Sequence, residues 1–383
     1  GCGNRGTGAA MNYLKAGPNL QLAAMADIFE DKMARSRTKL KEEMNVQVPD
    51  DKCYIGFDAY KKIMDSDVDI IIQATPPYFR PLHFAAAVES RKHVFMEKPL
   101  GVDPVGVRSI ISSAKKAEAI GLTVVTGTQK HHMPNYIEAY EKVLQGAIGE
   151  IVAANCYYNV GQLWYKKRQT GWSEMEWMLR DWVNWAWLSG DHIVEQHIHN
   201  IDVINWFMGE KFPVKAVSFG SRQRRITGNQ YDNFSTDFVY EGNIHEHSMC
   251  RQINGCANQI EDYIIGTKGY TDCESFIKSL DDKEIWKFSI NGGNDKQVSH
   301  RSGLDQEHIN MITAIRSNKP LNTAEFTAKS TLTAIMGRIS AYTGKEVTWD
   351  EVMKSNLRLG PENVTKFDSS EYFDHTIPVP GEE

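Results

Sequence analysis

The first residues of the chain form a glycine pattern of the kind that holds phosphate groups. Gly1, Gly3 and Gly6 have the spacing GxGxxG, and Asn4 and Arg5 stand between the second and third glycines. Such glycines allow a tight turn, a close approach of the backbone to a pyrophosphate, and packing of the next helix on a strand. The amino terminus of that helix offers free N–H groups and the positive end of its dipole. The pattern predicts a dinucleotide site, although any doubly wound domain can have a glycine-rich first turn.

An acidic residue follows at the distance that a dinucleotide site requires. Asp27 lies 21 residues after Gly6, at the end of an expected strand, where a carboxylate can accept hydrogen bonds from ribose hydroxyls. A 2′-phosphate would meet its negative charge, so the pattern favours NAD over NADP. Arg35 and Arg37 can soften that preference, which leaves NADP possible, and Asp27 can alternatively cap a helix.

Imidazoles and a carboxylate gather later in the chain. His192, Glu195, His197 and His199 lie within eight residues and suggest a metal site. Their spacing is not HExxH, and a further ligand would have to come from elsewhere. We therefore predict no metal.

An aromatic segment precedes these histidines. Residues 161–188 contain six of the nine tryptophans of the chain. Core packing beneath a long loop accounts for most of them. The alternative is a platform for a sugar, in which aromatic faces pack on the ring and neighbouring arginines bind hydroxyls. The candidates for such contacts are Trp164, Tyr165, Arg168, Arg180 and Trp185.

Residues 1–128 alternate between segments typical of strands and of helices. The strand-like segments are 20–26, 68–74, 93–96 and 122–127. The helix-like segments are 31–45, 81–91 and 103–120. This alternation predicts an α/β fold with a Rossmann-type doubly wound parallel sheet. Because no strand precedes the glycine turn, we expect this dinucleotide-binding domain to lack its first strand here, and with it the native N-terminus.

Residues 129–383 have a different pattern and predict a second domain for substrate and oligomerisation. The expected strands are 151–160, 214–220, 234–240 and 259–265, with helices at 305–317 and 324–343 and an arm at 369–383. Strands without regular helices between them predict an α+β domain with a largely antiparallel open sheet. One face of such a sheet tends to be buried against a copy of itself, so we expect a homo-oligomer, either a dimer or a tetramer.

Composition excludes several classes of protein. The 383 residues are 41% hydrophobic and 24% charged, which is ordinary for a globular chain. The net charge of −6 gives no basis for binding nucleic acid. No apolar run approaches the roughly 20 residues that cross a bilayer, so we expect no membrane contact. The six cysteines include no CxxC pair and are predicted to be free thiols.

Further motifs follow the glycine turn in a specific order. They are Ala74-Thr75-Pro76-Pro77, His83 with the following helix, Glu97-Lys98-Pro99, residues 190–202 ending in Trp206 and Gly209, and residues 341–347. In these motifs the chain resembles the Gfo/Idh/MocA family of oxidoreductases along nearly its whole length. The resemblance implies NAD(P)-dependent hydride transfer at a hydroxyl group of a sugar, glycoside or polyol.

The resemblance also implies roles for individual residues. Lys98 matches the family's catalytic lysine and His199 its catalytic histidine, while Glu195 stands where the family commonly has Asp. His197 replaces a small residue, so it either crowds the site or adds an imidazole that contacts substrate. Beyond the glycine turn and Asp27, the implied cofactor contacts are Thr75, Pro76, His83, Glu97, Lys98 and Gln129.

The chemistry of these side chains agrees with the resemblance. Alcohol oxidation needs a base with a pKa near the operating pH, which imidazole provides, and an ammonium can stabilise the developing alkoxide. If residues 195–199 are helical, Glu195 and His199 share one face. The same groups would serve an NAD-dependent glycosidase that oxidises transiently and then eliminates. A dinucleotide-binding regulator without activity is the third hypothesis. The sequence leaves the compartment open between the cytoplasm and export through a lost leader.

Overall fold

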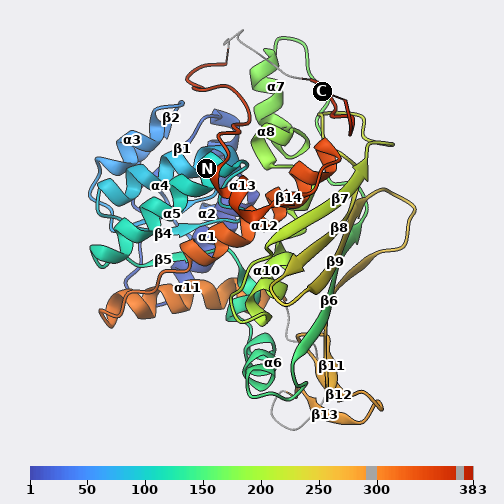
Figure 1. The fold of residues 1–383 in the computed structure, drawn as a ribbon. Coiled ribbons are helices and arrows are strands. Elements are labelled where there is room, and N and C mark those ends of the chain that lie inside the picture. The colour runs from blue at the N-terminus through green and yellow to red at the C-terminus, as the bar shows by residue number, and fades with distance from the viewer. Residues whose placement is uncertain (290–299, 368–374, 383) are drawn as a thin grey trace.

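The computed structural model describes residues 1–289, 300–367 and 375–382, and Figure 1 shows their arrangement. The first region alternates strands and helices, as expected. Its elements are α1 (Asn4–Lys15), β1 (Met25–Asp27), α2 (Glu30–Met44), η1 (Asp50–Lys52), β2 (Cys53–Ile55), α3 (Ala59–Met64), β3 (Ile70–Gln73), η2 (Pro77–Phe79), α4 (Arg80–Glu89), β4 (His93–Met96), α5 (Pro104–Ala119) and β5 (Val124–Thr126). After η3 (Gln129–His132) and α6 (Pro134–Leu144), the chain enters a second sheet.

The parallel strands form two separate ladders, β2-β1 and β3-β4-β5. Of the expected strand at 20–26, only residues 25 and 26 belong to a strand, as the first two residues of β1. Leu20–Ala24 instead line the space that separates β1 from β3. A segment without a neighbouring strand has no partner for its backbone hydrogen bonds, which explains the short β1.

The core of the first region lies on both faces of β4. Val94 and Met96 pack toward α4 and α5, whereas Phe95 packs with Tyr13 of α1 and Met311 of α11 (His300–Arg316). All three β4 side chains are fully buried. Alternate residues of a strand face opposite layers, so a strand covered by helices on both sides is apolar at successive positions.

The second region is built on a nine-stranded sheet of order β13-β12-β11-β10-β6-β9-β8-β7-β14. Its strands are β6 (Ile151–Val160), β7 (Lys215–Ser221), β8 (Asn233–Tyr240), β9 (Ile244–Gln252), β10 (Gln259–Gly266), β11 (Gly269–Thr271), β12 (Phe276–Ser279), β13 (Glu284–Lys287) and β14 (Val347–Thr348). Only β6 and β9 pair in parallel. Helix α12 (Ala324–Thr343) covers one face, while no helix among the described residues lies on the opposite face (Figure 1). The expected open, largely antiparallel sheet is thus confirmed.

Short helices connect β6 to β7, where no regular helices were expected. They are α7 (Glu174–Arg180), η4 (Trp182–Asn184), α8 (Ala186–Ser189), α9 (His192–Glu195) and α10 (Ile198–Phe207). After α12 and α13 (Trp349–Lys354) the chain returns as a coil to the first region. Of the expected arm 369–383, residues 369–374 and 383 lie outside the described residues. Within the described part of the chain, no helix combines the length and apolarity that a membrane span requires.

Candidate functional site

The glycine turn is built as a phosphate cradle. Helix α1 begins at Asn4, and no side chain caps its amino terminus. A Cβ on Gly6 would lie 1.9 Å from the carbonyl oxygen of Gly1, whereas a Cβ on Gly3 would meet nothing within 4 Å. Gly6 is therefore required for close packing, and Gly3 faces open space beside the exposed N–H groups of the helix. These residues fit the pyrophosphate of a dinucleotide.

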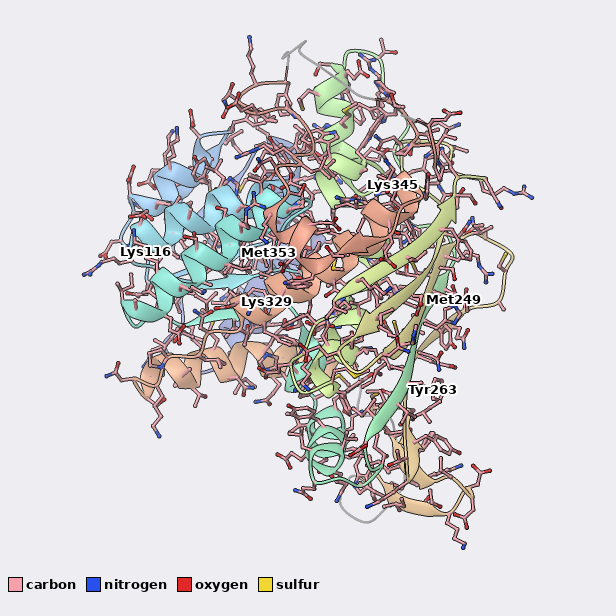
Figure 2. The ribbon with its side chains drawn as sticks, in the orientation of Figure 1. Lys116, Met249, Tyr263, Lys329, Lys345 and Met353 are labelled. Carbon is pink, nitrogen blue, oxygen red and sulfur yellow. The ribbon has the colours of Figure 1, made fainter. Side chains whose placement is uncertain are left out.

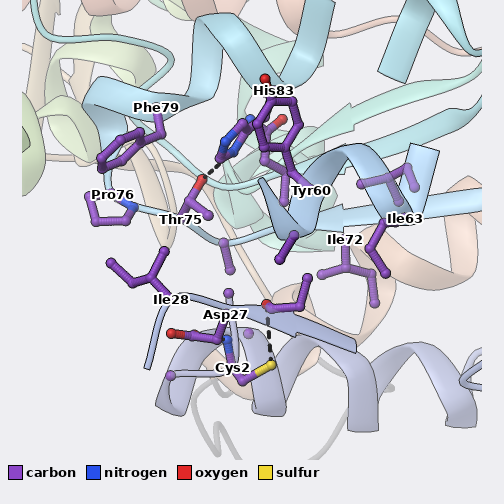
Figure 3. Close-up of a pocket in the computed structure, with 18 of the residues that line it drawn as sticks. Cys2, Asp27, Ile28, Tyr60, Ile63, Ile72, Thr75, Pro76, Phe79 and His83 are labelled. Atoms are coloured by element: carbon purple, nitrogen blue, oxygen red, sulfur yellow. Dashed lines mark hydrogen bonds between the residues drawn. The ribbon is translucent and has the colours of Figure 1, made fainter. Parts of the chain in front are cut away.

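Asp27 stands beside this turn at the carboxyl end of β1. Its Oδ2 accepts a hydrogen bond from the Cys2 amide at 2.5 Å, and its Oδ1 accepts one from the Phe29 amide at 2.9 Å. These bonds fix the carboxylate at the edge of the cavity, where a ribose hydroxyl can reach it (Figure 3). Of the two arginines that can soften a preference for NAD, Arg35 lines the cavity, whereas Arg37 pairs with Asp50 at 2.5 Å and does not line it.

The opposite wall follows β3. The Thr75 hydroxyl lies 3.3 Å from Nδ1 of His83, and the His83 ring packs against Tyr60 and Phe79 (Figure 3). Desolvation in this packing lowers the pKa of His83, which keeps the ring neutral. Neutral side chains thus flank the cavity opposite Asp27.

One cavity of about 1780 Å³ joins these features. It also extends between β1 and β3, so part of its volume is the space between the two ladders. The sequence-predicted residues that line it are Gly1, Gly3, Asn4, Arg5, Gly6, Asp27, Thr75, Pro76, His83, Trp164, Tyr165 and Arg180. The remaining predicted residues, Glu97, Lys98, Gln129, Arg168, Trp185, Glu195, His197 and His199, do not line it.

Lys98 and Glu195 meet where β4 ends against α9. The Lys98 ammonium donates to the backbone carbonyl of Glu195 and lies 3.2 Å from its Oε1. Both side chains are about one-tenth exposed, at 10% and 9%. Gln196 donates to the other Glu195 oxygen at 2.5 Å and accepts from the Tyr158 hydroxyl at 2.9 Å. Burial and the Glu195 carboxylate raise the pKa of Tyr158 to about 12, so its hydroxyl stays protonated. Tyr158 and Gln196 were not foreseen as site residues.

His199 lies four residues after Glu195, but the two do not share a helix. Helix α9 ends at Glu195 and α10 begins at Ile198, with Gln196 and His197 forming the break. The condition for a shared face, a continuous helix over residues 195–199, is therefore not met. His199 is half-buried in the first turn of α10, and its amide donates to the Gln196 carbonyl at 3.2 Å.

Arg5 and Glu97 bind each other. The Arg5 guanidinium also pairs with Glu307 of α11 at 2.9 Å, and Glu307 is fully buried. Burial and the nearby Glu97 carboxylate raise the pKa of Glu307. Because both carboxylates hold its guanidinium, Arg5 ties the glycine turn to the end of β4 rather than reaching for phosphate.

The structure corrects the prediction for His197. Its ring is fully buried, with Nε2 at 2.6 Å from the Ser248 hydroxyl and 3.5 Å from the Cys156 sulfur. Desolvation lowers the pKa of His197 to about 3. The ring packs beneath the large sheet and cannot contact substrate. Among the described residues, no three His, Cys, Asp or Glu side chains are placed to hold a metal ion.

Within the aromatic segment, Trp185 does not fit the sugar-platform hypothesis. Trp185 is 1% exposed and packs edge-on against Trp177, so it offers no face to a ligand. Arg168 donates to the backbone of Trp172 within its own loop. Arg180 pairs with Asp31 at 2.9 Å and lies 3.9 Å from the centre of the Phe29 ring.

Arg180 therefore contacts residues that directly follow Asp27. Trp164 and Tyr165 are exposed by 47% and 41% and line the same cavity as the glycine turn. These three side chains line the same cavity as the glycine turn, and Lys98 does not line it.

Comparisons with known proteins find similarity to oxidoreductases. Residues 1–126 match the model of an oxidoreductase family with an NAD-binding Rossmann fold. A 2,7-anhydro-N-acetylneuraminate hydratase of Escherichia coli is 28% identical over 37% of this chain and 34% of its own length. A myo-inositol 2-dehydrogenase of Thermotoga maritima is 31% identical over 39% of this chain and 41% of its own length. The matched stretches thus span about a third to two-fifths of these relatives.

A solved structure shows the same fold over most of the chain. The myo-inositol 2-dehydrogenase from Lactobacillus plantarum superposes with a TM-score of 0.66 at 20% identity. The superposition covers 91% of this chain and 97% of that protein. At this identity the likeness establishes the fold alone.

Proposed function

We propose that the chain is a Gfo/Idh/MocA oxidoreductase, on the match of its first 126 residues to an NAD-binding Rossmann family, and that it oxidises a secondary hydroxyl of a polyol or sugar. The observation that carries the proposal is the buried Lys98–Glu195 pair, because it lies at the carboxyl end of β4, where open α/β sheets bind ligands. The inositol dehydrogenases among its relatives support a cyclitol or a similar hydroxyl-rich ring as the substrate class.

The role of each residue in the proposed reaction follows from its position in the fold. The N–H groups at the start of α1 hold the pyrophosphate, and Asp27 holds the adenosine ribose. A bound nicotinamide supplies the hydride acceptor. Lys98 donates a hydrogen bond to the reacting oxygen and stabilises the charge that develops on it. His199 takes the hydroxyl proton, since a neutral imidazole is a base at neutral pH.

The residues around Lys98 explain how a hydroxyl-rich substrate is held. Glu195 positions the ammonium, and Gln196 links this carboxylate to the Tyr158 hydroxyl. A substrate with several hydroxyls can exchange hydrogen bonds with such a chain of donors and acceptors.

A panel of cyclitols, aldoses and linear polyols tests the proposal. Each compound is mixed with the protein and NAD or NADP, and formation of the reduced cofactor is followed by absorbance. We expect turnover with at least one hydroxyl-rich ring and its loss in Lys98→Ala and His199→Ala. If the protein binds neither dinucleotide, the proposal is wrong.

We also propose that the uncovered face of the nine-stranded sheet joins copies of the chain. The register aligns Phe219, Ser235, Met249, Tyr157 and Glu261 in one row across five strands. Met249 and Tyr263 lie on the side away from α12 (Figure 2), and Phe219 is 71% exposed. Light scattering should give a dimer or tetramer that Phe219→Lys weakens, and a wild-type monomer at micromolar concentration contradicts this proposal.

A further inference from the structure

The coil that follows α13 crosses the dinucleotide cavity. Residues 358–367, here named the strap, lie next to the N-terminus of the chain in Figure 1. The Leu359 amide donates to Oδ2 of Asp103 at 2.9 Å, and the Tyr78 hydroxyl donates to the Pro361 carbonyl. At its far end, the Ser173 hydroxyl donates to the Phe367 carbonyl. These bonds fasten the strap to the first region and to the start of α7.

The apolar side of the strap packs onto the end of the cavity next to Asp27. The Phe367 ring stacks on Phe29 with centroids 5.3 Å apart and an interplanar angle of 17°, and meets the edge of Phe57 at 5.0 Å. Phe29 and Phe57 each follow the end of a parallel strand by two residues, β1 and β2 respectively. In a doubly wound sheet the adenosine lies at these strand ends, beside the acidic residue.

The strap forms part of the cavity wall. Residues 358–365 line the same space as the glycine turn and Asp27. Leu359, Val364 and Phe367 also join the apolar cluster that contains Phe29 and Trp187, so lifting the strap would expose apolar surface.

The chain is anchored on both sides of this segment. Arg108 of α5 donates to the carbonyls of Met353 and Ser355, at 2.7 and 2.6 Å, just before the strap. Beyond it, the Tyr231 hydroxyl donates to the Pro378 carbonyl at 2.7 Å. A strap held at both ends opens less readily than a free terminus, because fewer conformations are available to it.

We propose that the strap closes over the adenosine end of the bound dinucleotide and slows its exchange. The inference rests on the proposed function, since it requires a dinucleotide in the cavity. Phe367 is then a cofactor-retaining residue, and the dinucleotide stays bound while substrate and product enter and leave at the Lys98 end.

The test measures release of NADH directly. The complex is mixed with excess NAD, and the loss of NADH fluorescence gives the dissociation rate. We expect Phe367→Ala to release NADH about ten-fold faster than wild type, because it removes two aromatic contacts. Leu280→Ala is the matched control, since Leu280 is 61% exposed in the turn between β12 and β13, and it should leave the rate unchanged.

A second variant covers the case in which Phe367→Ala unfolds. Tyr78→Phe keeps the ring but removes the hydroxyl that fastens Pro361, and it should also raise the release rate several-fold. If both variants release NADH at the wild-type rate, the strap does not slow exchange and this inference is wrong, while the proposed function is unaffected. If the wild-type protein binds no NADH or NADPH, the proposed function itself fails.

Discussion

Replacing Lys98 by methionine separates the structural role of the Lys98–Glu195 pair from its catalytic role. Both side chains are about 90% buried, so Lys98→Met leaves Glu195 as a poorly compensated buried carboxylate. Removing one partner of a buried ion pair typically costs about 3–5 kcal/mol. Losing an electrostatic donor to the reacting oxygen typically lowers kcat by about 10²–10³. Because Lys98 does not line the dinucleotide cavity, NADH affinity should change little.

The double variant Lys98→Met, Glu195→Gln distinguishes the two effects. It removes both charges, so most of the lost stability should return. The single variant Glu195→Gln completes a double-mutant cycle, which gives the interaction free energy of the pair. Urea unfolding measures stability, and formation of reduced cofactor measures turnover on the same preparations. We expect the double variant to be stable but still slow by about 10²–10³. If it regains turnover within a few-fold of wild type, Lys98 is structural and the site assignment is refuted.

Three further predictions follow from single side chains. His199→Ala should lower kcat by about 10²–10⁴ while NADH binding in a fluorescence titration stays unchanged, and near-native turnover would show that His199 is not the base. Asp27→Ala should weaken NAD more than NADP in the same titration, whereas an equal loss of both would contradict the ribose placement. His197 is neutral in the folded protein, where its pKa is about 3, against about 6.5 in the unfolded chain. Its contribution to the free energy of unfolding is therefore fully present above the unfolded pKa and is lost as the pH falls toward 3. That contribution falls by about 2 kcal/mol between pH 7 and pH 5. The Tm of His197→Gln should therefore fall less over this range than the Tm of the wild-type protein. An equal fall in both proteins would contradict the argument from burial.

Local sequence patterns predicted the elements that depend on local chemistry. The strands 93–96 and 151–160 and the helix 324–343 have the expected bounds, because burial on one or both faces leaves a periodic apolar pattern. Residues 20–24 have the same apolar pattern but are not a strand, since a strand also needs a paired neighbour. Strand β9 was missed because His245, Glu246 and His247 interrupt its apolar character, although Glu246 is fully buried.

The residues of the candidate site also divide into those with a local sequence signal and those without one. Gly1, Gly3, Gly6 and Asp27 were found from spacing, because the turn and the following strand lie within 27 residues. Glu307 and the strap reach the site from more than 300 residues away, and no local signal marks them. The spacing of Glu195 and His199 predicts a shared face only in an unbroken helix, and the structure has a break between α9 and α10.

The tryptophan-rich segment contacts the cavity that contains the glycine turn, so we look for substrate specificity in other residues. Arg180 contacts Phe29 and Asp31, close after Asp27, and Phe367 of the strap stacks on Phe29. We propose that both additions to the two sheets close the dinucleotide cavity. The groups left to recognise substrate are those around Lys98, where Glu195, Gln196 and Tyr158 form one hydrogen-bonded chain. Tyr158 comes from β6, which lies between β10 and β9 inside the large sheet. On this proposal the interior of that sheet supplies specificity, and the aromatic segment retains the cofactor. On this argument, substitutions at Tyr158 should change substrate preference, and substitutions at Arg180 should change dinucleotide affinity.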